Sequence, residues 1–210
     1  MMMLDPFGGW IYRGPREKRS IALTFDDGPS GSTSRLLEVL AHHDAHATFF
    51  QCGMHTRRHK DIARATAEAG HEIGNHTDSH RLLALRSRRF LRDELRRAQE
   101  SIAEATGQTP VLFRPPYGVR WFGLRGVLQE LGLLGVMWTK IGRDWKYPAD
   151  QVLRCLRRGV ANGAILCLHD GRDVEAEPDI ENTIEAVRRL LPELKDQGFR
   201  FETVSRLIAS

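Results

Sequence analysis

The amino-acid sequence predicts an α/β fold, a distorted parallel (β/α) barrel of about seven units. Short apolar or β-favouring runs alternate with helix-like segments from one end of the chain to the other, which favours a parallel sheet covered by helices. No Pro/Ser-rich linker, repeat or low-complexity segment interrupts the 210 residues. About seven units in a chain of this length leave room only for short connections, as in a closed or nearly closed barrel.

Each expected element is short and bounded by turn-forming residues. Strands are expected over residues 21–25, 47–52, 72–75, 111–113, 134–138, 164–168 and 199–203. Helices are expected over residues 34–41, 61–69, 89–105, 123–131, 149–160 and 180–196. Four glycines follow helical runs, where a left-handed residue is expected to end the helix: Gly70, Gly107, Gly132 and Gly198. The chain divides into an N-terminal extension, residues 1–18, and a single domain, residues 19–210.

The composition is that of an ordinary globular protein. Hydrophobic residues make up 41% and charged residues 28% of the chain, which excludes a disordered chain, a collagen and a disulfide miniprotein. The formal charge is +4, from 31 basic and 27 acidic residues. The arginines of residues 86–97 are mixed with acidic residues, which indicates a solvated, partly self-paired helix face. We therefore expect no nucleic-acid partner; such binding would instead depend steeply on salt.

The cysteines and the N-terminal residues bear on the cellular compartment of the protein. Cys52, Cys155 and Cys167 are odd in number and lack metal-finger spacing, so a disulfide framework is not expected. Residues 1–14 show neither the basic start nor the apolar run of a secretory signal, and no stretch has the length of a membrane span. We expect a soluble chain without an export signal, of unassigned oligomeric state.

Two adjacent carboxylates follow the first strand. Asp26 and Asp27 precede Gly28 and Pro29, and parallel α/β folds place their sites at the carboxyl ends of strands. Neighbouring carboxylates at a strand end point in different directions, so one can bind a metal while the other acts as a base. Asp-Gly-Pro is also good turn chemistry. A turn explains Gly28 and Pro29 but not two acids after an apolar strand.

Two histidines follow the third strand. His76 and His80 are four residues apart, which places them on one face of a helical turn, spaced to share one ion. Catalytic zinc sites use three protein ligands and a water. Nine histidines will form some pairs by chance, and we interpret the three at positions 42, 43 and 46 as surface or structural residues. Because Asp27 accompanies them, His76 and His80 are stronger candidates for metal ligands than a chance pair of histidines.

Three later strand ends also carry unusual polar or aromatic residues. Arg114 to Tyr117 follow the fourth strand, Asp144 and Trp145 follow the fifth, and His169 closes the sixth. Taken singly, Arg114 could be an ordinary ion-pair partner, Trp145 a core residue and His169 a cap. Five such groups at five strand ends predict one shared site at the barrel mouth, where His169 could exchange protons.

The order of these groups resembles a known family. Thr24-Phe25-Asp26-Asp27-Gly28-Pro29 resembles the signature of the polysaccharide deacetylases, carbohydrate esterase family four, which include the nodulation-type chitooligosaccharide deacetylase domain. Residues 76–80, 114–117, 144–145 and 166–169 resemble its four later motifs in the same order. The resemblance spans residues 19 to about 205. It implies a distorted barrel, in agreement with the strand and helix pattern.

The resemblance also implies a metal site with a base beside it. Asp27, His76 and His80 would hold one divalent metal, with zinc the expected ion and cobalt or nickel as alternatives. Asp26 would be the general base that activates the attacking water, and Arg114 would orient it. An amide carbonyl is a poor electrophile, so polarisation by a cation suits this reaction.

On the other side of the substrate, the resemblance implies an acid and a binding pocket. His169 would protonate the leaving amine, and Asp144 would orient it and balance its charge. The backbone N–H of Tyr117 would help to hold the oxyanion, and Trp145 would help to form the wall of the acetyl pocket.

Two residues depart from the family pattern. Ile141 stands where many members carry an aspartate, three positions before the Asp-Trp pair. Cys167 stands where leucine is usual, two positions before the acid histidine, and strand alternation puts it on the same face as His169. We expect Cys167 to line the acyl pocket as a substrate-binding residue, with room for a group other than a simple acetyl methyl.

The predicted function is therefore a metal-dependent hydrolase acting on carbon–nitrogen bonds other than peptide bonds. Its partner would be an N-acetylated glycan: a cell-wall glycan, a chitooligosaccharide or a lipid-linked sugar. The family implies a role at the cell envelope, with any anchor lying upstream; the alternative is a cytoplasmic protein. The alternatives are an amidase or deformylase acting on a small non-sugar amide, and an inactive carbohydrate-binding module. Retention of Asp26, Asp27, His76, His80 and His169 argues against the inactive module.

Overall fold

The computed structural model describes residues 9–209; residues 1–8 of the expected N-terminal extension and residue 210 lie outside the described range. Within residues 9–209, nine strands form one sheet. They are β1 (Trp10–Ile11), β2 (Ser20–Asp26), β3 (Ala47–Gln51), β4 (Glu72–Asn75), β5 (Leu112–Phe113), β6 (Leu134–Val136), β7 (Lys140–Ile141), β8 (Ile165–His169) and β9 (Arg200–Phe201).

The strands pair in parallel and the sheet curls toward closure. Their order is β1-β6-β5-β4-β3-β2-β8-β7, and β9 pairs with the start of β2. Residues 137–139 connect β6, near one end of this order, directly to β7 at the other end. Met137 donates its N–H to Ile11 of β1, while Thr139 donates its N–H to Ile165 of β8. This one segment therefore bridges both ends of the sheet, and the predicted distorted parallel barrel is confirmed.

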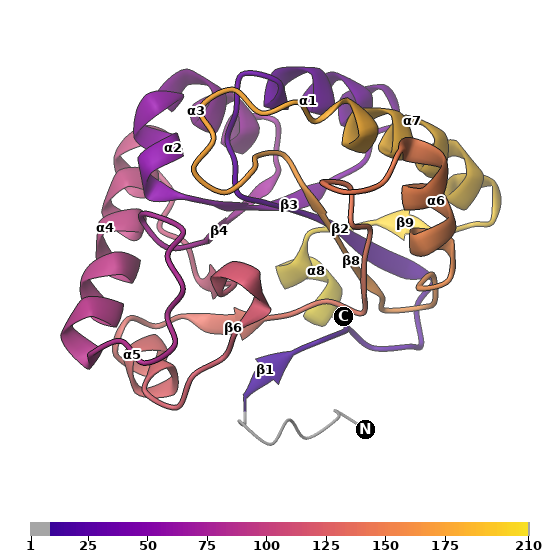
Figure 1. The fold of residues 1–210 in the computed structure, drawn as a ribbon. Coiled ribbons are helices and arrows are strands. Elements are labelled where there is room, and N and C mark those ends of the chain that lie inside the picture. The colour runs from indigo at the N-terminus through magenta and orange to yellow at the C-terminus, as the bar shows by residue number, and fades with distance from the viewer. Residues whose placement is uncertain (1–8, 210) are drawn as a thin grey trace.

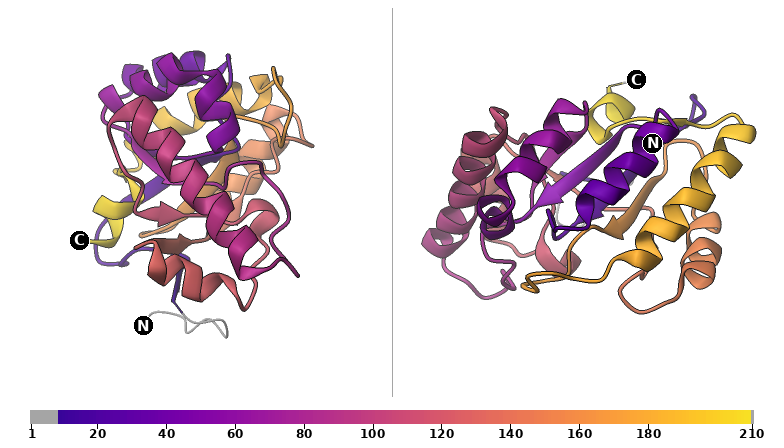
Figure 2. Two further views of the ribbon diagram at one scale, coloured as in Figure 1. Left: turned by 90° about the vertical axis from the view of Figure 1, so that its left-hand side faces the viewer. Right: turned by 90° about the horizontal axis from the view of Figure 1, so that it is seen from above.

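Helices surround the strands (Figures 1 and 2). They are α1 (Thr33–His42), α2 (Gly53–Arg58), α3 (Lys60–Glu68), α4 (Arg88–Thr106), α5 (Leu124–Glu130), α6 (Ala149–Arg157), α7 (Glu181–Asp196) and α8 (Val204–Ile208), with a 3-10 turn at Pro116–Gly118. The four glycines predicted to follow helices all have positive φ, between 65° and 80°.

The side chains of β2 show how the sheet positions the site. Ile21, Leu23 and Phe25 pack in the outer core beneath α1, α6 and α7. Because side chains alternate along a strand, the intervening positions face the barrel interior. Ala22 belongs to the interior core, and Asp26 follows on the same face at the carboxyl end of the strand. In the neighbouring strand β8, Cys167 is in register with Thr24, and His169 is in register with Asp26.

The interior core closes the end of the barrel opposite to Asp26. Ala22 and Ile165 line it near the start of β2, where α8 contributes Val204 and Leu207, and Phe50, in register with Asp26, continues this core toward the site. Since α8 and this apolar layer fill the barrel near the start of β2, the polar groups at the carboxyl ends of the strands lie at the other end.

All seven predicted strands and six predicted helices are present, with ends shifted by a few residues. The elements that the sequence did not indicate are short: β1, β7, α2 and α8. Too few residues repeat in them for a periodic pattern to appear. β1 lies in the segment assigned to the N-terminal extension, yet it pairs in parallel with β6.

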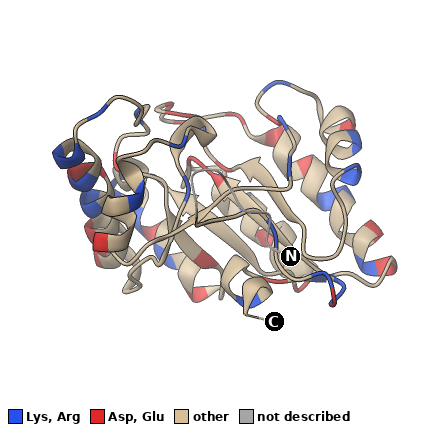
Figure 3. Ribbon diagram, turned by 90° about the horizontal axis from the view of Figure 1, so that it is seen from below, with Lys and Arg blue, Asp and Glu red and all other residues tan. Residues whose placement is uncertain are grey.

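The charged surface agrees with the expected self-paired helix. On α4, Arg89 pairs with Asp93, Arg96 with Glu100, and Arg97 with Glu94, and Figure 3 shows the two signs interspersed. In the part of the chain that the structure describes, no helix is long and apolar enough to cross a membrane. The three cysteines are free thiols.

Candidate active site

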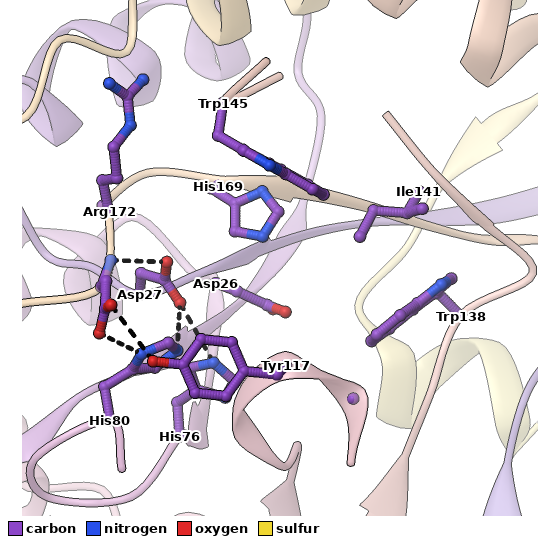
Figure 4. A pocket seen from close by; sticks show the side chains of 13 residues that line it. Asp26, Asp27, His76, His80, Tyr117, Trp138, Ile141, Trp145, His169 and Arg172 are labelled. Atoms are coloured by element: carbon purple, nitrogen blue, oxygen red, sulfur yellow. Dashed lines mark hydrogen bonds and ion pairs between the residues drawn. The ribbon is translucent and has the colours of Figure 1, made fainter. Parts of the chain in front are cut away.

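A cavity of about 460 Å³ opens at the carboxyl ends of the strands (Figure 4). The predicted polar groups and several aromatic side chains share it. It is lined by Asp26, Asp27, His76, His80, Tyr117, Gly118, Trp138, Ile141, Trp145, His169, Gly171, Arg172 and Asp173. The structure thus brings together the side chains that the sequence placed at five separate strand ends.

Asp27, His76 and His80 meet at one side of the cavity. Asp27 has a φ of 74°, which turns its side chain away from that of Asp26. Its Oδ1 lies 3.2 Å from His76 Nε2 and 3.0 Å from His80 Nε2. Burial disfavours the charge of Asp27, but the hydrogen bonds from both imidazoles outweigh it and hold the pKa of Asp27 well below its ordinary value.

The loop carrying the two histidines differs from the expectation. We predicted a helical turn over residues 76–80, whereas this segment is irregular, with φ of 69° at Thr77 and 52° at His80. Side chains replace helical hydrogen bonds here: Asn75 Oδ1 accepts the N–H of Thr77, and Thr77 Oγ1 accepts the N–H of His80. These local bonds compete with a helix, yet they still bring both imidazoles to Asp27.

The ring orientation of His76 and His80 suits metal binding. His76 Nδ1 lies 2.7 Å from the carbonyl oxygen of Arg114, and His80 Nδ1 lies 2.7 Å from Asp173 Oδ1. Both partners only accept hydrogen bonds, so each Nδ1 carries a proton, and each Nε2, which donates to Asp27 here, would offer its lone pair once a cation displaces its proton. Carbonyl or carboxylate groups behind an imidazole are the usual support of a metal-ligating histidine.

The spacing of Asp27 Oδ1, His76 Nε2 and His80 Nε2 also fits a divalent cation. Zinc binds imidazole nitrogen and carboxylate oxygen at about 2.0–2.2 Å in tetrahedral geometry, which separates two such ligand atoms by about 3.4 Å. The observed separations from Asp27 Oδ1, 3.2 Å and 3.0 Å, require only a small expansion. One carboxylate and two imidazoles also match the donor preference of zinc.

Asp173 is a contributor that the sequence analysis missed. Besides its bond to His80, it donates its backbone N–H to Asp27 Oδ2 at 2.9 Å and accepts the Tyr117 hydroxyl at 3.2 Å. His55 Nε2 contacts the Asp173 carbonyl oxygen at 2.9 Å and fixes this loop. Asp173 belongs to no recognised motif, but its position just after the β8 end is a signal that could have indicated it.

Asp26 occupies the centre of the cavity floor beside a buried arginine. Arg114 Nη1 donates to Asp26 Oδ1 at 2.6 Å and to Thr24 Oγ1 at 2.7 Å. Arg114 is fully buried, and its Nη2 donates to the Met137 carbonyl at the seam of the sheet. The guanidinium also lies 4.1 Å from the centre of the Phe50 ring. As expected for a residue that orients Asp26, Arg114 fixes one carboxylate oxygen and leaves Oδ2 for other partners.

His169 lies on the opposite side of Asp26 from the histidine pair. Its Nδ1 is 2.9 Å from Asp144 Oδ1, and its backbone N–H donates to Asp144 Oδ2. Thr183 also donates to Asp144, at 2.6 Å. Burial alone would lower the pKa of His169, but the charge and hydrogen bond of Asp144 outweigh burial and raise this pKa to about 9.

Aromatic side chains form the rim. The Trp145 ring stands edge-on to His169, with centroids 4.8 Å apart, and the Tyr117 ring stands edge-on to His80 at the same distance. Both remain about half exposed, 46% for Trp145 and 57% for Tyr117. Trp138 and Ile141 complete the wall (Figure 4). Ile141 is the position at which the family pattern has an aspartate, so this wall is apolar here.

Cys167 is not where we expected it. It faces inward on the same side of β8 as His169, as alternation predicted, but it is fully buried and absent from the cavity lining. Its Sγ lies 3.4 Å from Asp26 Oδ2, because register places it one layer deeper, beside Thr24. Burial, followed by the charge of Asp26, raises the pKa of the Cys167 thiol well above its ordinary value, so the thiol is protonated and donates to Asp26.

Asp170 secures the loop that carries the two acids. It is fully buried and accepts the Thr33 hydroxyl at 2.8 Å, while its backbone carbonyl accepts that of Ser30. Burial raises the pKa of Asp170 to about 7. A side chain at Gly28 would come within 2.1 Å of the Asp170 carboxylate, which is why glycine is required at that turn.

This combination defines a class of protein: a parallel α/β barrel that gathers one carboxylate and two imidazoles able to hold a divalent cation, with a second carboxylate and a third imidazole beside them, is the apparatus of a metal-dependent hydrolase. Residues 13–136 match the family described as polysaccharide deacetylase. The chain belongs to the polysaccharide deacetylase family, whose members include hydrolases of carbon–nitrogen bonds other than peptide bonds.

Two relatives cover nearly the same length as this chain. A peptidoglycan-N-acetylglucosamine deacetylase of Bacillus cereus is 34% identical over 209 residues, which are 98% of this chain and 95% of the relative. A chitooligosaccharide deacetylase of Sinorhizobium fredii is 35% identical over 188 residues, 86% of this chain and 87% of the relative.

Solved structures agree with this family. A peptidoglycan N-acetylglucosamine deacetylase matches with a TM-score of 0.88 and 29% identity, over 96% of this chain and 94% of that one. A pseudoenzyme of carbohydrate esterase family 4 from Bacillus anthracis matches with a TM-score of 0.86 and 29% identity, over 95% of this chain and 68% of that one. The fold thus occurs in active and inactive proteins, and the residues of the site have to distinguish them.

Proposed function

We propose that this protein removes N-acetyl groups from N-acetylglucosamine residues of a glycan, with a divalent cation held by Asp27, His76 and His80. The observation that carries the proposal is the placement of Asp26. It lies in the cavity floor between the histidine pair and His169, with one oxygen fixed by Arg114. A base, a cation site and an acid thus surround one space large enough for an acetamido group.

The cation site is proposed for zinc, with cobalt or nickel able to replace it. When bound, the cation supplies Lewis-acid activation of the amide carbonyl and of a water molecule. Asp27 gives the site one negative charge, and His76 and His80 give two neutral donors whose orientation is fixed by Arg114 and Asp173.

Asp26 is proposed as the general base. Arg114 is permanently charged and fully buried, so it holds Asp26 Oδ1 in one orientation at 2.6 Å. The other oxygen, Oδ2, is the one able to take a proton from the attacking water. Such a positioned base contributes about 10²–10⁴-fold to a rate.

His169 is proposed as the acid that protonates the departing amine. An amine leaves poorly unless it is protonated, so the imidazole must carry its second proton when the C–N bond breaks. Asp144 binds Nδ1–H, directs Nε2 toward the cavity and favours the imidazolium, because it raises the pKa of His169 to about 9. Asp144 acts only through His169 and is a positioning residue.

The rim supports a sugar substrate. The rings of Trp145 and Tyr117 are about half exposed beside the cavity, and amphipathic aromatic rings of this kind suit a ligand with one apolar and one polar face. The apolar wall of Trp138 and Ile141 suits the acetyl methyl, and the Tyr117 backbone N–H remains our proposal for the oxyanion donor. The relatives named for peptidoglycan and for chitooligosaccharides make both glycans the first substrates to test.

Acetate release from a panel of N-acetylated glycans tests the proposal. The metal-free protein is supplied with zinc, cobalt or nickel and assayed on peptidoglycan fragments, chitooligosaccharides and a small non-sugar amide. We expect metal-dependent release of acetate from at least one glycan and little from the small amide. No release from any glycan by metal-loaded protein would contradict the proposal and favour an inactive carbohydrate-binding protein.

A further inference from the structure

A second group of metal-ligating side chains lies directly beside the first. Asp26, Cys167 and His169 each offer one ligand atom, and these three atoms all lie within 4.8 Å of one another. They are an oxygen, a sulfur and a nitrogen, and zinc accepts all three in protein sites. The group shares no side chain with the site of Asp27, His76 and His80.

The closest pair in this group already has the spacing of a metal site. With zinc–sulfur at about 2.3 Å and zinc–oxygen at about 2.1 Å, two ligands of a tetrahedral ion are separated by about 3.6 Å. Cys167 Sγ lies 3.4 Å from Asp26 Oδ2. To bind an ion between them, His169 would have to move closer. Its ligand atom lies within 4.8 Å of the other two, a limit that exceeds the ligand–ligand distance of a tetrahedral ion by about 1 Å.

The ring of His169 is oriented as that of a ligand. Asp144 Oδ1 binds Nδ1 at 2.9 Å, which leaves Nε2 for a partner in the cavity. A carboxylate behind an imidazole is the arrangement that supports metal-bound histidines. Asp144 is itself fixed by Thr183 and by the backbone N–H of His169, so this orientation does not depend on a substrate.

An ion can reach Asp26 and His169 from the cavity, and movement of the Asp26 carboxylate would give it access to the buried Cys167. Asp26 and His169 line the cavity, and Cys167 lies immediately behind Asp26. We propose that Asp26, Cys167 and His169 form a second, inhibitory site for a thiophilic divalent cation such as zinc. On binding, the sulfur–metal bond replaces the S–H bond of Cys167 and the nitrogen–metal bond replaces the Nε2–H bond of the His169 imidazolium, and both protons leave to solvent. Three protein ligands and one cavity-facing position complete a tetrahedral ion.

This second site should be weaker than the first. The buried Arg114 guanidinium lies 2.6 Å from Asp26 Oδ1, and an ion on Asp27 adds a further positive charge nearby. Both repel a second dication, so the second site fills only when metal exceeds one equivalent. Its inhibitory effect rests on the proposed function, because the ion would occupy both the base and the acid. The site itself does not depend on that function.

Titration of the metal-free full-length protein with Co²⁺ tests the site without an activity assay. The site of Asp27, His76 and His80 contains no sulfur, so thiolate-to-cobalt charge-transfer absorption in the near ultraviolet reports the second group alone. We expect the first equivalent to add no such band and the second to add it. The band should disappear in Cys167→Ala and Cys167→Ser, and persist in the matched thiol controls Cys52→Ala and Cys155→Ala.

Excess zinc then tests the consequence. Zinc beyond one equivalent should inhibit acetate release by the wild type, and Cys167→Ala should raise the inhibition constant by at least about tenfold, since loss of a ligand exceeds the usual effect of losing a supporting residue. Each variant is compared with its own rate at one equivalent. A Cys167→Ala protein that binds the first cobalt normally but keeps the sulfur band would overturn the site, as would a wild type without any band. If the sulfur band appears but excess zinc does not inhibit, the second site exists and its inhibitory role is overturned.

Discussion

Replacement of Asp173 by alanine tests the support of the cation site. The change removes the carboxylate that lies 2.7 Å from His80 Nδ1 but leaves the backbone N–H that binds Asp27 Oδ2 at 2.9 Å. Asp27 therefore keeps its orientation, while His80 loses its support and the Tyr117 hydroxyl loses its acceptor. Loss of such a residue typically weakens metal affinity about 10–100-fold, which corresponds to about 1.4–2.7 kcal/mol.

Competition with a chromophoric zinc chelator measures this affinity. Asp173→Asn keeps an oxygen acceptor for His80 Nδ1 and should lose much less affinity than Asp173→Ala. Tyr117→Phe removes only the hydroxyl on the other Asp173 oxygen and serves as a control for the cavity rim. If folded Asp173→Ala binds zinc as tightly as the wild type, the hydrogen bond does not orient His80 and the reasoning is refuted.

Three other variants test the remaining contacts. His169→Ala should lower kcat on the amide by about 10²–10⁴-fold and lower turnover of an activated ester of the same acyl group much less; equal losses would remove His169 from its role as acid. Asp144 raises the pKa of His169 to about 9, so in Asp144→Asn the imidazolium loses its proton at lower pH. The alkaline limb of the kcat–pH profile should therefore shift toward neutrality. An unchanged limb would show that Asp144 does not stabilise the imidazolium. Arg114→Met should destabilise the protein by about 3–5 kcal/mol in urea unfolding because Asp26 is left as a buried unpaired charge, whereas Arg157→Met, which breaks a surface pair with Glu193, should cost less than about 1 kcal/mol; equal effects would contradict the assigned burial.

The parts of the site that could be predicted are those fixed by the topology of a parallel barrel. Because all strands point the same way, the residues after β2, β4, β5 and β8 must converge at one mouth. Asp26, His76, Arg114 and His169 could therefore be placed together before any contact was known. The different orientations of Asp26 and Asp27 also follow from their adjacency, whereas the positive φ of Asp27 was visible only in the structure.

The parts that could not be predicted depend on contacts between distant segments. Asp173 is 93 residues from His80 in the chain, and no local pattern joins them. For Cys167, alternation gave the correct face of β8 but not the depth, which is set by its register with Thr24. The loop of His76 was mistaken for a helical turn because the bonds made by Asn75 and Thr77 leave no periodic signal.

The most direct test of the account is a paired measurement on Asp26→Asn, which keeps the shape of the base but cannot take a proton. Bound metal and acetate release from the glycan that the wild type prefers are measured on the same preparation. The account predicts about one equivalent of zinc, as for a single three-ligand site, and loss of acetate release by about 10²-fold or more. Full acetate release, or a protein that no longer holds its zinc, would contradict it, the latter because Asp26 would then be a ligand of the cation at Asp27, His76 and His80 and not the base.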